Sequence, residues 1–158
     1  MSTLILLDNT VLSNFAQAKI VSAVFSLWGD QVCTTTEVME EYKAGIASVG
    51  LPKSAWKGLK IAKQTEEEQA FGVKFSTRLG AGERSCLAIA HTRGAIFATD
   101  DLYARELAKK YHIVVIGTVG ILMECAAKNI LTRTQAQHAL EQMIANGYRS
   151  PIEDINEL

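Results

Sequence analysis

Residues 3–10 read TLILLDNT, and this stretch decides the fold. Thr3–Leu7 is a short apolar run, which is typical of a buried strand in a parallel sheet. The run ends abruptly at Asp8, and a helical pattern of apolar residues follows it. Because ligands bind at the carboxyl ends of the strands in open α/β sheets, the carboxylate of Asp8 is placed for chemistry.

The rest of the chain alternates between short apolar runs and helical patterns. This alternation predicts an α/β protein, a three-layer α/β/α sandwich with a central parallel sheet of four or five strands, in which residues 1–158 form a single domain. Strands are predicted at Thr3–Leu7, Gln31–Thr34, Ala95–Thr99 and Ile113–Ile116. Helices are predicted at Thr10–Lys19, Ile20–Trp28, from Thr35 or Thr36 to Gly45, Thr65–Arg78, Glu83–Arg93, Leu102–Tyr111, Val119–Lys128 and Thr132–Ala145. A flexible connection is predicted at Gly45–Pro52 and a turn at Leu79–Gly82.

The composition is that of a soluble globular protein. The 158 residues are 48% hydrophobic and 21% charged, and no apolar run approaches the ~20 residues of a membrane span. Cys33, Cys86 and Cys125 stand singly, so neither a zinc site nor a disulfide framework is indicated, and a reducing cytoplasmic location is expected. A net charge of -1 does not by itself indicate a nucleic-acid partner.

Further carboxylates stand at comparable places in the predicted elements. Asp101 follows the strand Ala95–Thr99 with Asp100 beside it, and Glu41 and Glu83 fall in the first turns of predicted helices. Carboxylates that converge on one crevice repel each other unless a hard divalent cation neutralises them. Without the four acids of such a site, 13 Asp and Glu would remain against 16 Lys and Arg, which is compatible with a nucleic-acid substrate.

Five segments in this order resemble the PIN-domain nucleases, in particular the bacterial and archaeal branch that includes VapC-like toxins. The segments are LILLDNTVLSNFA (4–16), TTTEVMEEYKAG (34–45), LGAGERSCLAIA (79–90), ATDDLYARELA (98–108) and IVVIGTVGILMECAAKNIL (113–131). Each segment alone is a weak signal, whereas the set covers nearly the whole chain. The resemblance implies a metal-dependent ribonuclease that uses Mg²⁺ or Mn²⁺.

Position by position, the resemblance implies that the catalytic and metal-binding residues are Asp8, Glu41, Glu83 and Asp101. Within the second segment, Glu41 fits the family pattern best. Glu37 lies four residues earlier on the same helix face and is the alternative ligand to Glu41, whereas Glu40 lies about 100° away around the helix axis. Asp100 could bind the metal through water or cap the following helix.

Polar and basic residues near the acids are candidates for supporting roles. The residues that would hold a carboxylate or a metal-bound water are Thr99, Ser13 and Asn9. The candidates for RNA binding are Lys43, Lys53, Lys57, Lys60 and Arg84. Three of these lysines fall at helical spacing near Trp56, which would stack on a base. The alternative is a solvated lysine face with Trp56 in the core.

Two other classes of function fit the sequence less well. A haloacid-dehalogenase-like phosphohydrolase needs a second Asp two positions after the first, where this chain has Thr10. A non-catalytic relative that binds nucleic acid or a partner would have no reason to tolerate four clustered carboxylates.

The toxin resemblance also implies an antitoxin protein as partner, and the apolar stretches Gly117–Leu131 and Thr132–Ala145 predict a homodimer.

Overall fold

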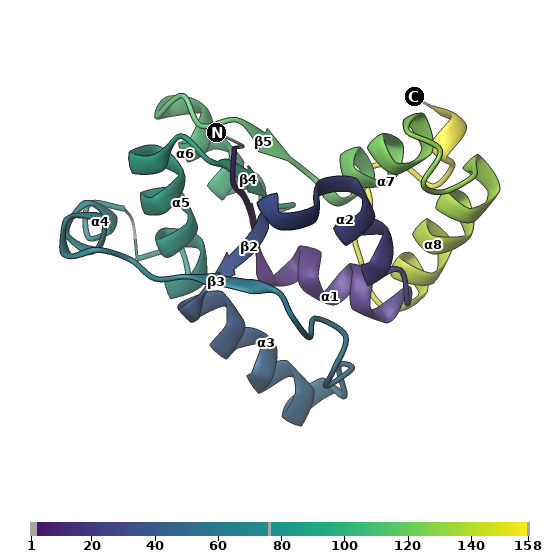
Figure 1. Ribbon diagram of the computed structural model, residues 1–158, viewed down its shortest axis with the longest axis horizontal. Helices are drawn as coiled ribbons and strands as arrows, with labels where there is room; N and C mark the ends of the chain where they lie inside the picture. Colours follow the sequence, from purple (N-terminus) through teal and green to yellow (C-terminus); the bar gives the residue numbers. More distant parts are fainter. Residues whose placement is uncertain (1–2, 76, 158) are drawn as a thin grey trace.

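The computed structural model describes residues 3–75 and 77–157 (Figure 1). Over these residues the chain forms one five-stranded sheet, eight α-helices and two short 3-10 helices. The strands are β1 (Ile5–Leu7), β2 (Val32–Thr35), β3 (Lys60–Ala62), β4 (Ile96–Ala98) and β5 (Val115–Ile116). The helices are α1 (Asn9–Gln17), α2 (Val21–Trp28), η1 (Gly29–Gln31), α3 (Thr36–Val49), α4 (Glu66–Gly72), α5 (Ala81–Arg93), α6 (Leu102–Lys110), α7 (Thr118–Ala127), α8 (Arg133–Ala145) and η2 (Ile155–Glu157).

The five strands are parallel and follow the order β3-β2-β1-β4-β5. β1 lies at the centre, where Leu6 pairs with Cys33 of β2 on one side and with Phe97 of β4 on the other. Leu6, Leu7 and Phe97 are fully buried, as expected for strands that helices cover on both faces. Because the strands are parallel, their carboxyl ends meet at one edge, from which α1 and α3 leave in Figure 1.

Helices pack on the sheet in two groups. α5 contacts β1, β2 and β4, and α3 and α4 pack against α5. In the other group α2 contacts α7, while α1 and α7 each contact α8. The α/β/α architecture predicted from the sequence is therefore confirmed. Within the described residues no single helix is long and apolar enough to cross a membrane, although the bent pair Asn9–Gln17 and Val21–Gln31 passes on length and composition only.

α3 is about one turn longer than predicted. It continues through Gly45 to Val49 and ends at Gly50, which has a left-handed φ of 72°. The flexible connection predicted at Gly45–Pro52 is therefore wrong. Gly45 serves close packing, because a Cβ there would lie 2.5 Å from Cδ1 of Leu51. Gly50 is the glycine that ends the helix, since its left-handed backbone favours this residue.

The segment after α3 also differs from the prediction. Residues 53–58 form turns and β3 follows, so the helical spacing proposed for Lys53, Lys57 and Lys60 is wrong. β3 becomes the fifth strand because it pairs with β2, which no local pattern reveals. The helix predicted at Thr65–Arg78 is reduced to α4, and beyond it the chain turns and buries Phe75. Residue 76 of that prediction lies outside the described residues.

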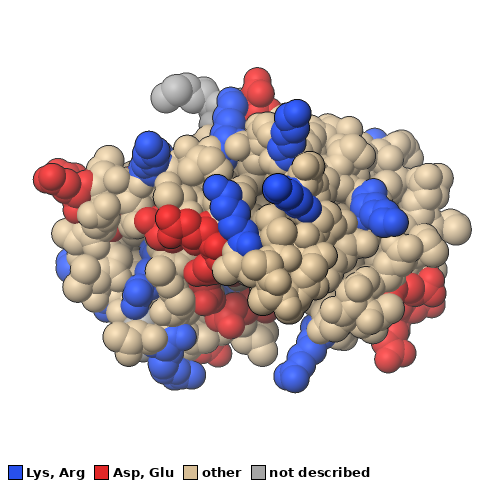
Figure 2. Space-filling model, turned by 90° about the horizontal axis from the view of Figure 1, so that it is seen from below, with Lys and Arg blue, Asp and Glu red and all other residues tan. Residues whose placement is uncertain are grey.

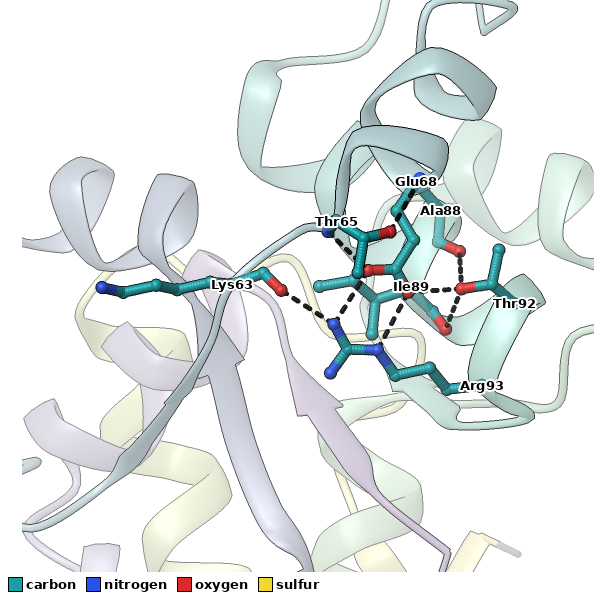
Figure 3. Close-up of polar contacts among 7 residues, drawn as sticks. All are labelled: Lys63, Thr65, Glu68, Ala88, Ile89, Thr92 and Arg93. Carbon is teal, nitrogen blue, oxygen red and sulfur yellow. Dashed lines mark hydrogen bonds and ion pairs between the residues drawn. The ribbon is translucent and has the colours of Figure 1, made fainter.

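An ion pair between the buried Glu68 and the exposed Arg93 fastens α4 to α5 (Figure 3). Glu68 accepts hydrogen bonds from Nε of Arg93 at 2.9 Å and from its Nη2 at 2.8 Å, and the Thr92 hydroxyl donates to the same carboxylate. The N–H of Thr65 also donates to Glu68 at 2.9 Å, in a capping box that begins α4. The hydrogen bonds from Arg93 are the main reason that the pKa of Glu68 is lowered to about 2. This contact fixes the last turn of α5, the helix that carries Glu83 in its first turn.

Candidate active site

The structure brings the four predicted acids together at the carboxyl edge of the sheet. Asp8 and Asp101 follow β1 and β4 and are the capping residues of α1 and α6. Glu41 lies in α3, and Glu83 lies in the first turn of α5. In the view from below, one group of acidic side chains lies among Lys and Arg side chains, and other acidic side chains lie toward the edges of this face (Figure 2). Residues from four separate elements thus form one acidic centre.

Asp8 is the most buried of these acids, with 4% of its surface exposed. Its Oδ1 accepts a hydrogen bond from the N–H of Asn9 at 2.8 Å, and its Oδ2 accepts one from the hydroxyl of Thr99 at 2.7 Å. Burial raises the pKa of Asp8 to about 6, although both hydrogen bonds act to lower it. The negative charges of Glu41 and Asp101 add to the rise.

Glu83 has one carboxylate oxygen without a hydrogen-bond partner in the part of the chain that the structure describes. Its Oε1 accepts from the N–H of Gly80 at 3.2 Å, whereas its Oε2 is buried and pairs with no group in the described residues. Burial, and then the charge of Asp8, raise the pKa of Glu83 to about 7. The negative charge of Asp101 also raises the pKa of Glu83. A cation bound at Oε2 would satisfy an oxygen that the protein leaves unpaired.

Glu41 is the acid of α3 that contacts the beginning of α5. Its Oε1 accepts a hydrogen bond from the N–H of Gly82 at 2.9 Å. Glu40 is exposed, and Glu37 has a buried Oε1 without a partner in the described part of the chain. The contact with Gly82, together with the effect of its charge on Asp8, favours Glu41 as the ligand from this helix.

Gly82→Ala should displace Glu41. A Cβ at position 82 would lie 2.7 Å from Oε1 of Glu41 and 2.9 Å from its Oε2, closer than real side chains approach. We expect the nuclease activity implied by the sequence to fall about 100-fold, because small displacements of catalytic groups have effects of this size. Gly80→Ala is the matched control, since its Cβ would stand 3.5 Å from the same Oε1. Equal initial rates for the two variants would contradict the role given to Glu41.

Asp100 holds the surrounding structure together. Its Oδ1 accepts hydrogen bonds from the N–H of Thr118 at 2.9 Å and from the hydroxyl of Tyr148 at 3.1 Å, and its Oδ2 accepts from the Thr118 hydroxyl at 2.5 Å. Asp100 thus caps α7 and ties the C-terminal segment to the sheet. Nearby, Arg105 donates to the carbonyl oxygen of Thr99 at 3.1 Å. Sequence reasoning missed Tyr148, because no local pattern links it to an acid 48 residues earlier.

The predicted supporting residues occupy different places. Thr99 contacts Asp8, whereas Ser13 and Asn9 line a hollow beside Asp101. Oδ1 of Asn9 is buried and has no hydrogen-bond partner among the described residues. Arg84, the residue after Glu83, is half-buried in the first turn of α5.

The predicted RNA-binding lysines lie in two places. Lys43, Lys53 and Lys57 border an apolar groove of about 510 Å³ between α3 and the turns that follow it. Lys60 lies on β3, with its Nζ 3.7 Å from a carboxylate oxygen of Asp30. Trp56 is buried and donates a hydrogen bond from Nε1 to the carbonyl oxygen of Leu12 at 2.8 Å. The base-stacking role suggested for Trp56 is therefore wrong, and its alternative place in the core is confirmed.

The acidic centre is chemically suited to a hard divalent cation. All four side chains offer carboxylate oxygens, the donors that Mg²⁺ and Mn²⁺ prefer. Two of them have raised pKa values because burial and neighbouring negative charge disfavour ionisation, and Oε2 of Glu83 lacks a partner. In the described ranges, no three His, Cys, Asp or Glu side chains are grouped as a ready-made ligand set, and each acid is held by a donor of the protein. The residue types and their electrostatics fit a metal centre.

Comparison with known proteins gives one match. A model of the DUF3368 family, described as a PIN domain, matches residues 4–158. No curated protein and no solved structure matches the chain. The matched range includes all four acids of the centre.

Proposed function

Because the chain belongs to the PIN-domain family, a nuclease-type fold, we propose that it is a metal-dependent endoribonuclease. The observation that carries this proposal is the buried, unpartnered Oε2 of Glu83 among converging carboxylates. The residues that would hold Mg²⁺ or Mn²⁺ are Asp8, Glu41, Glu83 and Asp101. A purely structural centre would gain stability from apolar side chains at these positions, so the retained charge supports catalysis.

The protein's own contribution is to orient the ligands. A bound divalent cation supplies a water of lowered pKa and neutralises charge on the phosphate. The hydroxyl of Thr99 fixes the carboxylate of Asp8, and the N–H of Gly82 fixes that of Glu41. Asp101 uses its Oδ2 to cap α6 at the N–H of Ala104, at 2.7 Å, which leaves its Oδ1 for a ligand. Partners that hold each carboxylate reduce the rearrangement needed during the reaction.

A covalently closed circle of single-stranded RNA tests the proposed activity. With Mg²⁺ or Mn²⁺ the chain should convert the circle to a linear strand, because an endonuclease needs no free end. A DNA circle of the same sequence should stay closed. Hydrolysis of linear RNA without opening of the circle would identify an exonuclease, and opening of the DNA circle alone would overturn the ribonuclease proposal.

We further propose that the biological role is that of a toxin in a toxin–antitoxin pair, with an antitoxin protein as partner and a homodimer as the assembly. The five resembling segments support this role. Expression of the wild-type chain should slow bacterial growth and shorten cellular RNA, whereas Asp8→Asn should do neither at matched protein levels. Growth curves and RNA length profiles are the measurements. If neither chain slows bacterial growth, the toxin role is contradicted and the nuclease proposal is unaffected.

A further inference from the structure

Two hollows meet beside the acidic centre. The first, of about 490 Å³, runs along α1 and has a mixed lining, with Thr10, Ser13 and Gln17 from α1 together with the apolar Val49 and Leu51. The second, of about 840 Å³, lies between α6, β5 and α7 and is lined by apolar side chains that include Leu102 and Val119. Four residues line both hollows, and we call them the saddle: Asp100, Asp101, Tyr148 and Arg149. The candidate metal ligand Asp101 therefore stands where a hollow of mixed lining and a mostly apolar hollow meet.

The C-terminal segment supplies half of the saddle. The chain leaves α8 through Gly147, whose φ of 104° favours glycine. Tyr148 is then held by its N–H, which donates to the carbonyl oxygen of Met143 at 3.0 Å, and by its hydroxyl, which donates to Asp100. Arg149 directly follows this anchored residue. Its backbone is thus fixed next to the acidic centre.

Among the described residues, Arg149 is a cation without a partner of its own. It is exposed, borders both hollows, and makes no hydrogen bond or ion pair in the described part of the chain. Arg105, which also lines the second hollow, is engaged with the carbonyl oxygen of Thr99. The planar guanidinium of arginine matches the oxygens of a phosphate and binds them with two parallel hydrogen bonds. A phosphodiester that approaches four carboxylates needs such a positive group beside them.

Resting on the proposed nuclease function, we propose that single-stranded RNA crosses the saddle and that Arg149 binds a phosphate next to the one that is cut. On one side the ribose–phosphate chain lies along the polar side chains of α1 that line the first hollow. On the other side an unstacked base enters the apolar hollow, where Leu102 is 77% exposed. Two different hollows suit a single strand, because its unstacked bases point away from its backbone, so that bases and backbone contact different surfaces. Arg149 is thus a substrate-binding residue.

The test measures binding and cleavage separately. In an Asp8→Asn background, adding Arg149→Ala should weaken binding of a labelled single-stranded RNA about tenfold and lower the log–log salt slope by about 0.7, the value for one phosphate contact. In the active chain, Arg149→Ala should raise KM about tenfold and leave kcat within about twofold. Arg149→Lys should recover part of the affinity, because the charge remains while the planar fork is lost.

Arg133→Ala is the matched control, since Arg133 is an exposed arginine of α8 that lines neither hollow. It should bind and cut RNA like the parent chain. An RNA with an abasic nucleotide next to the cleavage position should bind more weakly than normal RNA, and this loss should be larger for the parent chain than for Leu102→Ser. An equal loss of affinity in the two chains would overturn the proposal that a base enters the apolar hollow. Parental affinity, salt slope and KM in Arg149→Ala would overturn the phosphate site and leave the nuclease proposal standing. A parent chain that cuts no RNA would overturn the nuclease proposal itself.

Discussion

Asp8→Asn should lower RNA cleavage by about two to three orders of magnitude and leave the fold intact. The substitution keeps the size of the side chain but replaces a charged ligand with a weaker, neutral one. The buried position and the contacts with Asn9 and Thr99 are compatible with an amide, because its oxygen can still accept one of these hydrogen bonds. Initial rates on single-stranded RNA at saturating Mg²⁺ measure the effect, with circular dichroism to confirm folding.

The same variant has an expected effect on stability. At pH 7 without metal, Asp8 is ionised at a site where its pKa of about 6 shows that the charge is less favourable than in the unfolded chain. Removal of the charge relieves this cost, so Asp8→Asn should melt at no lower temperature than the wild type. A large fall in melting temperature would mean that the lost activity reflects unfolding.

Glu40→Gln is the control for position, because Glu40 is exposed and lies outside the contact with Gly82. It should keep most of the cleavage activity, whereas Glu41→Gln should not. An inactive Glu40→Gln with an active Glu41→Gln would show that the ligand from α3 has been assigned to the wrong acid.

The metal-free protein should lose stability as the pH rises from about 5 to about 8. Asp8 and Glu83 have folded pKa values of about 6 and about 7, above their ordinary values of 3.8 and 4.5. The folded state therefore binds more protons than the unfolded state in this pH window. The stabilisation that results is fully present below the ordinary pKa values and is lost as the pH rises through the folded pKa values. For the buried Asp8 the change is on the order of 2 kcal/mol. Mg²⁺ or Mn²⁺ should restore the melting temperature most strongly at the alkaline end, where both ligands are deprotonated.

Thermal melting at several pH values, with chelator or with added Mg²⁺, measures this dependence. The double variant Asp8→Asn, Glu83→Gln should show a flatter profile and little stabilisation by the ion, because both titrating carboxylates have been removed. Glu68 does not interfere, since its pKa of about 2 places its titration below the window. A wild-type melting temperature that rises steadily from pH 5 to pH 8 without metal would contradict the electrostatics assigned to the centre.

Most of the fold could be predicted from local sequence patterns. The apolar run before Asp8 is both a strand signal and the reason that the acid stands at a carboxyl edge. Of the two acids after the Ala95–Thr99 run, Asp101 caps α6, whereas Asp100, predicted to bind the metal through water or to cap this helix, accepts hydrogen bonds at the beginning of α7. The Gly-rich turn before Glu83 is the beginning of α5, where the N–H of Gly80 contacts its carboxylate.

The features that sequence reasoning missed depend on contacts between distant segments. β3 is a strand because it lies beside β2, and its own sequence shows only alternating basic and apolar residues. Gly45 resembled a break in α3, whereas its small size admits Leu51 against the helix. Tyr148 and Arg149 reach the acids only because α8 turns the chain back toward the sheet. Such pairings leave no periodic trace in a single sequence.

Cleavage of single-stranded RNA while Mn²⁺ is titrated into chelator-treated protein tests the central claim most directly. The centre of four carboxylates predicts a background rate without the ion and a saturable rise as it is added. The rise should be absent from Asp8→Asn and present in Glu40→Gln. A chelated wild-type protein that cuts RNA as fast as the metal-loaded one, with Asp8→Asn equally active, would contradict a metal-dependent mechanism at this site.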